Sequence, residues 1–335
     1  MASELDQWLN QIKEDPLEPD LPMCDPHHHM WDYPDSRYMP VDLVEDMKGH
    51  NVVSTVFVEC TSEYRTGGPE SMKPVGETEF MNRIAEEYCS EESPEIAISA
   101  GIVSFADLCL GREVQPVLEA HMAASPEYFR GIRHACSWDA SNEVRNSHTK
   151  PFEHLYLDKT FRQGLACLEP LNLTFDAWCY HTQILELVDM ARTHPGVSII
   201  LDHFGGPLGI GPYEGKRDEI FVEWKKNIEE LAKCPNVVMK LGGLLMPING
   251  WGYHKRDVPP TSEELATATA RYYLHCIEQF GPERCMFESN FPVDRKTASF
   301  NVLWNSFKRI AKDFSDSEKA DLFHDTAARV YNLKY

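Results

Sequence analysis

Residues 21–32 read LPMCDPHHHMWD, an apolar lead-in followed by three consecutive histidines. This pattern is typical of a β-strand that ends in polar side chains. Because side chains alternate between the two faces of a strand, His27 and His29 point to one side and His28 to the other. Two imidazoles on one face can bind a single metal ion or a substrate, and the alternative is a solvated strand end.

A change from an apolar run to helical periodicity recurs along the whole chain. Continuous apolar strands that alternate with helices indicate a parallel sheet covered by helices. Eight such units in about 300 residues predict an α/β fold, a single-domain (β/α)8 TIM barrel, with a doubly wound open sheet as the alternative. The predicted strands lie near 22–28, 52–59, 96–103, 129–135, 173–180, 197–202, 236–243 and 284–289. The predicted helices lie near 41–48, 77–89, 112–123, 154–168, 182–194, 218–233, 262–279, 297–312 and 316–332.

Local signals mark two helix starts and four long loops. Thr261–Glu264 and Ser315–Glu318 resemble capping boxes, which predict helices that begin directly after Thr261 and Ser315. We expect residues 1–20 to form an N-terminal extension and residues 21–335 to form the barrel. Extra length follows four of the predicted strands, and barrel active sites are built from such loops. We therefore expect long βα loops over the active site at 61–76, 136–153, 204–217 and 244–261.

The composition excludes several classes of partner. The chain has 335 residues and a formal net charge of −21, which argues against binding to nucleic acid or an anionic membrane. An anionic substrate must then be held by local arginine or lysine side chains. No apolar run of about 18 residues occurs, and the acidic N-terminus lacks the features of a signal peptide. Ten cysteines without a C-x-x-C pair fit a reducing compartment, so we expect a cytoplasmic protein, and homo-oligomer formation stays open.

Polar side chains collect at the carboxyl ends of the predicted strands, and four of them are histidines. Together these histidines could bind one metal ion. We expect zinc in the first place, because zinc lowers the pKa of a bound water to about 7, while catalysis without a metal stays open. The fourth strand offers no lysine that could be carbamylated into a bridging ligand, so we expect at most one ion. The candidate ligands are His27, His29, His181 and His203.

A second group of polar residues is predicted to bind a small, anionic substrate. Arg133 suits a bidentate hold on a carboxylate, and the alternative is an ion pair inside the barrel rim. Lys240 lies in an apolar strand, so it needs either a buried carboxylate such as Asp202 or a substrate anion. Tyr180 and several tryptophans could line a pocket for a cyclic substrate. The predicted substrate-binding set is Arg133, His134, Lys240, Glu59 and Tyr180.

Six motifs occur in a fixed order along the chain. Together they resemble the amidohydrolase superfamily, in particular the branch that contains fuconolactonase, 2-pyrone-4,6-dicarboxylate lactonase and related decarboxylases. The resemblance implies a barrel that hydrolyses lactones or amides, or decarboxylates acids, in some members with one divalent metal. It also implies that His27 and His29 are the first-strand pair, with His181 and His203 at the fifth and sixth strands. The motifs are DPHHHMWD at 25–32, GIR at 131–133, FDAW at 175–178, LDHFGGP at 201–207, MKLGG at 239–243 and MFESNFPVD at 286–294.

The chain departs from the family pattern at the eighth strand. The residue after the serine of that strand is usually an aspartate that binds metal and acts as general base, and here it is Asn290. A carboxamide cannot accept a proton at neutral pH, although it can bind a metal weakly or orient a water. We expect Asp294 or Glu288 to be the base instead, with His203 as the next candidate.

Three functions remain open at this point. The first is a hydrolase that opens a small lactone or amide bearing a carboxylate by water attack in the histidine-rich site. The second is a metal-dependent, non-oxidative decarboxylase, which needs no hydrolytic water. The third is a barrel that binds a ligand without turnover, an alternative that rests on Asn290.

Overall fold

Eight parallel strands form one sheet in the structure, a computed structural model that describes residues 3–89 and 96–334. The strands follow one another around the sheet in chain order. The first and last strands meet where the His29 N–H donates to the Phe291 carbonyl at 2.8 Å and the Asn290 N–H donates to the His27 carbonyl at 2.9 Å. The sheet is thus a nearly closed barrel, and the predicted fold is confirmed. The strands are β1 (Met23–His28), β4 (Val52–Val58), β5 (Ala97–Ser104), β6 (Phe129–Arg133), β7 (Thr174–Ala177), β8 (Ile199–Leu201), β9 (Val237–Leu241) and β10 (Cys285–Phe287).

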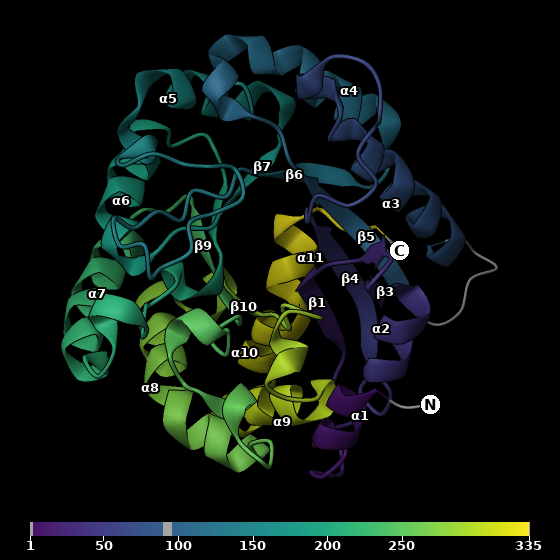
Figure 1. The fold of residues 1–335 in the computed structure, drawn as a ribbon, viewed down its shortest axis with the longest axis vertical. Coiled ribbons are helices and arrows are strands. Elements are labelled where there is room, and N and C mark those ends of the chain that lie inside the picture. The colour runs from purple at the N-terminus through teal and green to yellow at the C-terminus, as the bar shows by residue number, and fades with distance from the viewer. Residues whose placement is uncertain (1–2, 90–95, 335) are drawn as a thin grey trace.

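Helices surround the strands, as Figure 1 shows. Two capping boxes are confirmed: Thr261 accepts from the Glu264 N–H and Ser315 from the Glu318 N–H, at the starts of α8 and α10. The α-helices are α1 (Glu4–Leu9), α2 (Pro40–Asp46), α3 (Val75–Tyr88), α4 (Gln115–Ala124), α5 (Lys159–Leu165), α6 (Ile184–Thr193), α7 (Arg217–Ala232), α8 (Ser262–Phe280), α9 (Phe300–Ile310), α10 (Asp316–Ala320) and α11 (Thr326–Val330).

Three details differ from the sequence prediction. The helix predicted over 154–168 begins at Lys159, because Asp158 is its N-cap and accepts from the Thr160 and Phe161 amides. The helix predicted over 316–332 is divided by a π-helical turn, Asp321–Asp325. A small antiparallel hairpin, β2 (Trp31–Tyr33) and β3 (Ser36–Tyr38), follows β1 and was not predicted.

The C-terminal helices fill the barrel and its seam. The last helix, α11, lies between β1 and β10 (Figure 1). Tyr331, directly after α11, is fully buried in an apolar cluster with members from six of the eight strands, so this cluster lies inside the barrel. The cluster comprises Cys24, Val56, Val58, Val103, Ile200, Val238, Met286, Ala327 and Tyr331.

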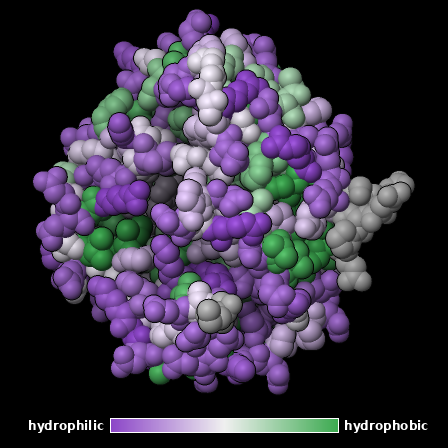
Figure 2. All heavy atoms as spheres, turned by 45° about the vertical axis from the view of Figure 1, so that its right-hand side comes forward, coloured by the Kyte–Doolittle hydropathy of each residue, from purple (hydrophilic) through white to green (hydrophobic). Residues whose placement is uncertain are grey.

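The outer surface agrees with the strongly acidic composition. The face in Figure 2 is mostly hydrophilic, and its hydrophobic side chains gather in separate patches. Within the described residues, no helix combines the length and the apolar character that a membrane span requires.

Candidate active site

A cavity of about 320 Å³ opens at the carboxyl ends of the strands, where barrel active sites form. Two of the four predicted long loops, 136–153 and 244–261, contribute to its wall. No carboxylate is among its lining residues within the described chain. The cavity is lined by His29, Arg133, Ala135, Ser137, Arg145, Asn146, Ser147, His148, Trp178, Tyr180, His203, Met246, Ile248, Asn290 and Val293.

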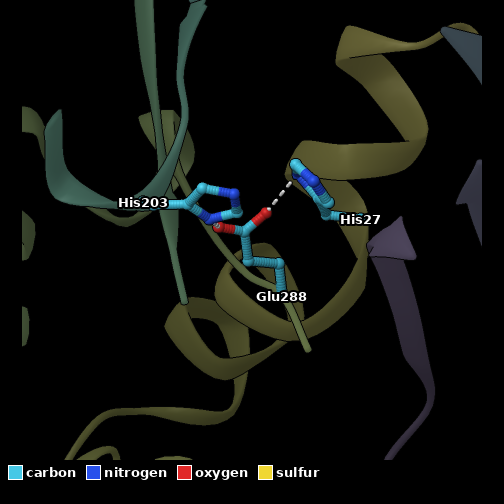
Figure 3. Close-up of side chains that lie close together, drawn as sticks. All are labelled: His27, His203 and Glu288. Carbon is cyan, nitrogen blue, oxygen red and sulfur yellow. Dashed lines mark hydrogen bonds and ion pairs between the residues drawn. The ribbon is translucent and has the colours of Figure 1, made fainter. Parts of the chain in front are cut away.

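The Glu288 carboxylate lies between the imidazoles of His203 and His27, and of these three residues only His203 lines the cavity (Figure 3). His203 donates from Nδ1 to Glu288 Oε1 at 2.7 Å, and Nδ1 of His27 lies 2.8 Å from Oε2. Burial alone would raise the pKa of Glu288, but His203 and His27 outweigh burial and lower the pKa to about 2. Glu288 is therefore an ionised acceptor that fixes the orientation of His203.

The backbone around His203 is shaped to bring its ring onto Glu288. His203 and Phe204 follow β8 with φ of 53° and 60°, a left-handed conformation that non-glycine residues rarely adopt and that clusters at functional sites. A Cβ atom at Gly243 would lie 2.1 Å from Nδ1 of His203, so only glycine leaves room for the ring. Because Nδ1 donates to Glu288, Nε2 carries the lone pair of the neutral ring.

His29 presents a second imidazole to the cavity. Its Nδ1 donates to the Val58 carbonyl at 2.7 Å, which leaves the lone pair on Nε2. Burial, followed by the charge of Arg133, lowers the pKa of His29 to about 3. His29 is therefore a neutral acceptor at ordinary pH.

His27 is fully buried and does not line the cavity. Its Nδ1 lies 3.2 Å from Nζ of Lys240 in addition to its contact with Glu288, and its Nε2 lies 3.3 Å from Nη1 of Arg133. Neither ring nitrogen therefore offers a free lone pair. Burial and the charge of Lys240 hold the pKa of His27 well below its usual value.

Arg133 forms the rim ion pair and also lines the cavity. Its Nε donates to Glu59 Oε1 at 2.8 Å and its Nη2 donates to the Glu59 carbonyl at 2.6 Å. Nε2 of His148 lies 3.4 Å from the second carboxylate oxygen of Glu59. Burial would raise the pKa of Glu59, but Arg133 and His148 together outweigh burial and lower the pKa to about 2. Three of the five N–H groups of Arg133 contact Glu59 and His27, and its Nη1 also lies 3.8 Å from Asp202 Oδ2. Two N–H groups, one on Nη1 and one on Nη2, make no hydrogen bond within the described residues.

Lys240 has buried carboxylate partners and does not reach the cavity. Its Nζ donates to Asp176 Oδ2 at 2.6 Å and lies 3.3 Å from Asp202 Oδ1. The Tyr331 hydroxyl donates to the same oxygen of Asp176 at 2.7 Å. All four side chains are buried, so this charged group belongs to the barrel interior.

Two predicted histidines lie outside the cavity wall. Nδ1 of His134 accepts from the Leu108 N–H at 3.2 Å, and its ring packs against Phe161. Nδ1 of His181 accepts from the Leu208 N–H at 3.3 Å. The structure thus brings together His27, His29 and His203 but does not place His181 with them.

The residues proposed to replace the missing aspartate are also placed by the structure. Glu288 and Asp294 are buried and neither lines the cavity, whereas His203, Asn290 and Tyr180 do. The Asn290 side-chain amide donates to Asp294 Oδ1 at 3.3 Å. Burial raises the pKa of Asp294 to about 7. Among the three candidate bases, His203 is the one with a lone pair at the cavity.

A catalytic zinc ion usually takes three protein ligands, and the residues present do not fit this requirement. The ligand atoms of His27, His203 and Glu288 lie within 4.8 Å of one another, but they contact each other, with Lys240 beside them. The free imidazole nitrogens at the cavity are those of His29 and His203. The third position would fall to the weak amide of Asn290, near the permanent charge of Arg133.

Sequence reasoning missed the basic loop residues of the cavity wall. Arg145 and His148 lie in the 136–153 loop, together with the polar Ser137, Asn146 and Ser147. Basic residues in a βα loop of a strongly acidic chain were the available signal. Their position depends on how the loop folds back over the strands.

Known proteins resemble the chain over nearly its full length. The profile of the amidohydrolase family matches residues 24–333. An uncharacterised protein of Sinorhizobium fredii is 31% identical over 94% of this chain and 99% of its own length. An L-fucono-1,5-lactonase of Burkholderia multivorans is 29% identical over 92% of this chain and 95% of its own. The solved structure of a Burkholderia multivorans amidohydrolase with bound zinc has a TM-score of 0.71 at 24% identity, covering 93% of this chain and 99% of that one.

Proposed function

Because the chain belongs to the amidohydrolase family and is an enzyme of the hydrolase type, we propose that it hydrolyses a small lactone that carries a carboxylate. The observation that carries this proposal is the Glu288–His203 pair at a cavity whose wall has cations and no carboxylate among the described residues. The lactonase named among the relatives favours a lactone over an amide. Membership of a hydrolase family argues against the alternative of a barrel that binds a ligand without turnover.

In this proposal His203 is the general base. A water molecule in the cavity attacks the lactone carbonyl carbon and gives its proton to Nε2 of His203. Glu288 holds the ring through Nδ1 and stabilises the imidazolium that forms, as the third member of a catalytic triad does. The ring C–O bond then breaks, and the leaving oxygen takes the proton back from Nε2. The product is a hydroxy acid, and the base returns to its neutral form.

Arg133 is proposed to stabilise the oxyanion that develops on the carbonyl oxygen. Its two remaining N–H groups are donors in a buried site, where electrostatic stabilisation is strongest. Glu59 fixes the guanidinium from the opposite side. This assigns Arg133 to the carbonyl rather than to the substrate carboxylate. The chemistry needs no metal ion, in agreement with a donor set that does not fit one.

The test measures ring opening of a panel of lactones. The acid that is released is titrated at constant pH. We expect the wild type to open lactones that carry a carboxylate. His203→Gln should lower kcat by about 10²–10⁴, the range of a general base. His154→Gln, a histidine change at an exposed surface site, is the control and should keep full activity. Release of CO₂ instead of acid would contradict the proposed hydrolase and support the decarboxylase.

A further inference from the structure

The 136–153 loop is held firmly against the cavity. The Ser147 N–H donates to the Ser137 carbonyl at 3.0 Å, and the Asp139 N–H donates to Asn146 Oδ1 at 2.7 Å. The Tyr180 hydroxyl donates to the backbone carbonyl of Arg145. These bonds tie the middle of the loop to its base and to the segment after β7. The backbone of Arg145 is therefore positioned at the cavity wall before any ligand binds.

Arg145 differs from the basic residues Arg133 and His148, which also line this cavity. Arg133 is paired with Glu59, and His148 lies 3.4 Å from the same carboxylate. Arg145 lines the cavity, and no carboxylate pairs with it within residues 3–89 and 96–334. A guanidinium carries five donors in a planar fork that matches a carboxylate. Arg145 is exposed to solvent, so its guanidinium is available to an anion that enters the cavity.

The rest of the wall fits an apolar ring. Trp178, Met246 and Ile248 contribute aromatic and aliphatic surface, and His203 and Arg133 provide the reacting groups. A substrate with a lactone at one end and an anionic group at the other matches both parts of this wall. A cavity of about 320 Å³ is at the lower end of small-molecule sites, so a single ring with short substituents is the right size.

We propose that Arg145 is the specificity-determining residue of this site and binds the free carboxylate of an acidic lactone. The inference rests on the proposed lactone hydrolysis and adds which residue selects the substrate. The selected class is a monocyclic lactone whose carboxylate is separate from the scissile ester. Arg133 then stabilises the oxyanion of the ester carbonyl, and Arg145 binds the free carboxylate.

The experiment compares an acidic lactone with its own methyl ester, which has the same ring but no charge. Arg145→Met should lower the preference for the acid, as the ratio of the two kcat/KM values, by about 10- to 100-fold, since a charge-assisted bond is lost. The loss should appear mainly as a higher KM for the acid. Arg145→Lys should restore part of the preference. Lys150→Met removes the same charge from the same loop outside the cavity wall, so its ratio should equal that of the wild type.

Two outcomes separate this inference from the proposed function. If the wild type opens lactones but Arg145→Met keeps the preference ratio, or if the wild type prefers the methyl ester, the role of Arg145 is wrong and the lactonase stands. If the wild type opens no lactone, calorimetry with glutarate decides the role of Arg145. Glutarate binding that Arg145→Met weakens at least about tenfold supports the carboxylate site, and equal binding overturns it.

Discussion

In the proposed mechanism Glu288 orients the reacting histidine, although Glu288 itself does not line the cavity. Its two oxygens face His203 and His27, and its pKa of about 2 keeps it ionised. The neighbouring Asn290 cannot take a proton, and we assign the basic role to His203 because Glu288 orients its ring. In this proposal one buried carboxylate selects His203 as the reacting histidine and Nε2 as its reacting nitrogen.

Replacing Glu288 by glutamine tests this assignment. We expect Glu288→Gln to lower kcat by about 10²–10⁴ with a much smaller change in KM, because the amide no longer fixes the tautomer of His203. Circular dichroism should show an unchanged fold. Steady-state kinetics on the best lactone substrate separates the effect on kcat from the effect on KM. A variant that keeps the wild-type kcat would show that His203 does not need its carboxylate.

Glu77 gives a pH-dependent prediction away from the reacting atoms. Its carboxyl accepts from the Cys60 and Ser62 amides, and burial, followed by the charge of Glu59, raises its pKa to about 8. The unfolded chain ionises near the usual pKa of 4.5, while the folded protein keeps the proton. Between these values the folded state binds more protons, so its stability falls as pH rises.

Glu77→Gln keeps an oxygen for both amides but cannot ionise. The free energy of unfolding of the wild type should therefore fall relative to that of Glu77→Gln, on the order of 1–3 kcal/mol between pH 5 and pH 8.5. Urea denaturation of both proteins at several pH values measures the difference. A constant difference across this range would contradict a proton held by Glu77.

At the scale of elements, strands were predictable and the segments between them were less so. Strands buried on both faces read as apolar runs, so all eight were placed within a few residues. The β2–β3 hairpin was missed because its short strands are mostly exposed and form no apolar run, unlike the equally short β8 and β10. The start of α5 depends on Asp158 as N-cap, a signal weaker than the helical periodicity around it.

The segment after α11 links the end of the chain to the barrel interior. The Tyr331 hydroxyl donates to Asp176, which also accepts from Lys240. Tyr331→Phe should lower the free energy of unfolding by about 1–3 kcal/mol, because a buried carboxylate loses a donor. Thermal or urea denaturation measures this, with the exposed Tyr33→Phe as the control. Equal loss in both variants would contradict a special role for the buried bond.

At the scale of the whole molecule, charge is distributed unevenly. The chain carries −21 overall, yet the cavity wall has arginines and histidines and no carboxylate among the described residues. A divalent cation would therefore be repelled by the arginines of the cavity, where the family resemblance implies a metal site. The same distribution would favour entry of the anionic substrate that we propose.

Metal removal is the corresponding prediction. Dialysis against a chelator should leave the lactonase activity and Tm unchanged, and the purified protein should hold less than about 0.2 transition-metal ions per chain. Asn290→Asp adds an anionic ligand at a backbone φ of 55°, which aspartate tolerates as asparagine does. Zinc should raise the Tm of Asn290→Asp more than that of the wild type. Loss of activity on chelation would contradict the metal-free mechanism.

The sequence by itself determined the barrel and the end of it that carries the site. Both follow from local patterns, since apolar runs make strands and polar residues at their carboxyl ends meet on one rim. Tertiary structure alone decided which of these residues act together. Arg133 and His134 are adjacent in the chain, but Arg133 lines the cavity whereas His134 accepts from the Leu108 N–H outside the cavity wall. Arg145 lines the cavity because hydrogen bonds within its loop and one from Tyr180 hold the loop in place. Side-chain direction and long-range packing are properties of the folded chain, so they were outside the reach of any local pattern.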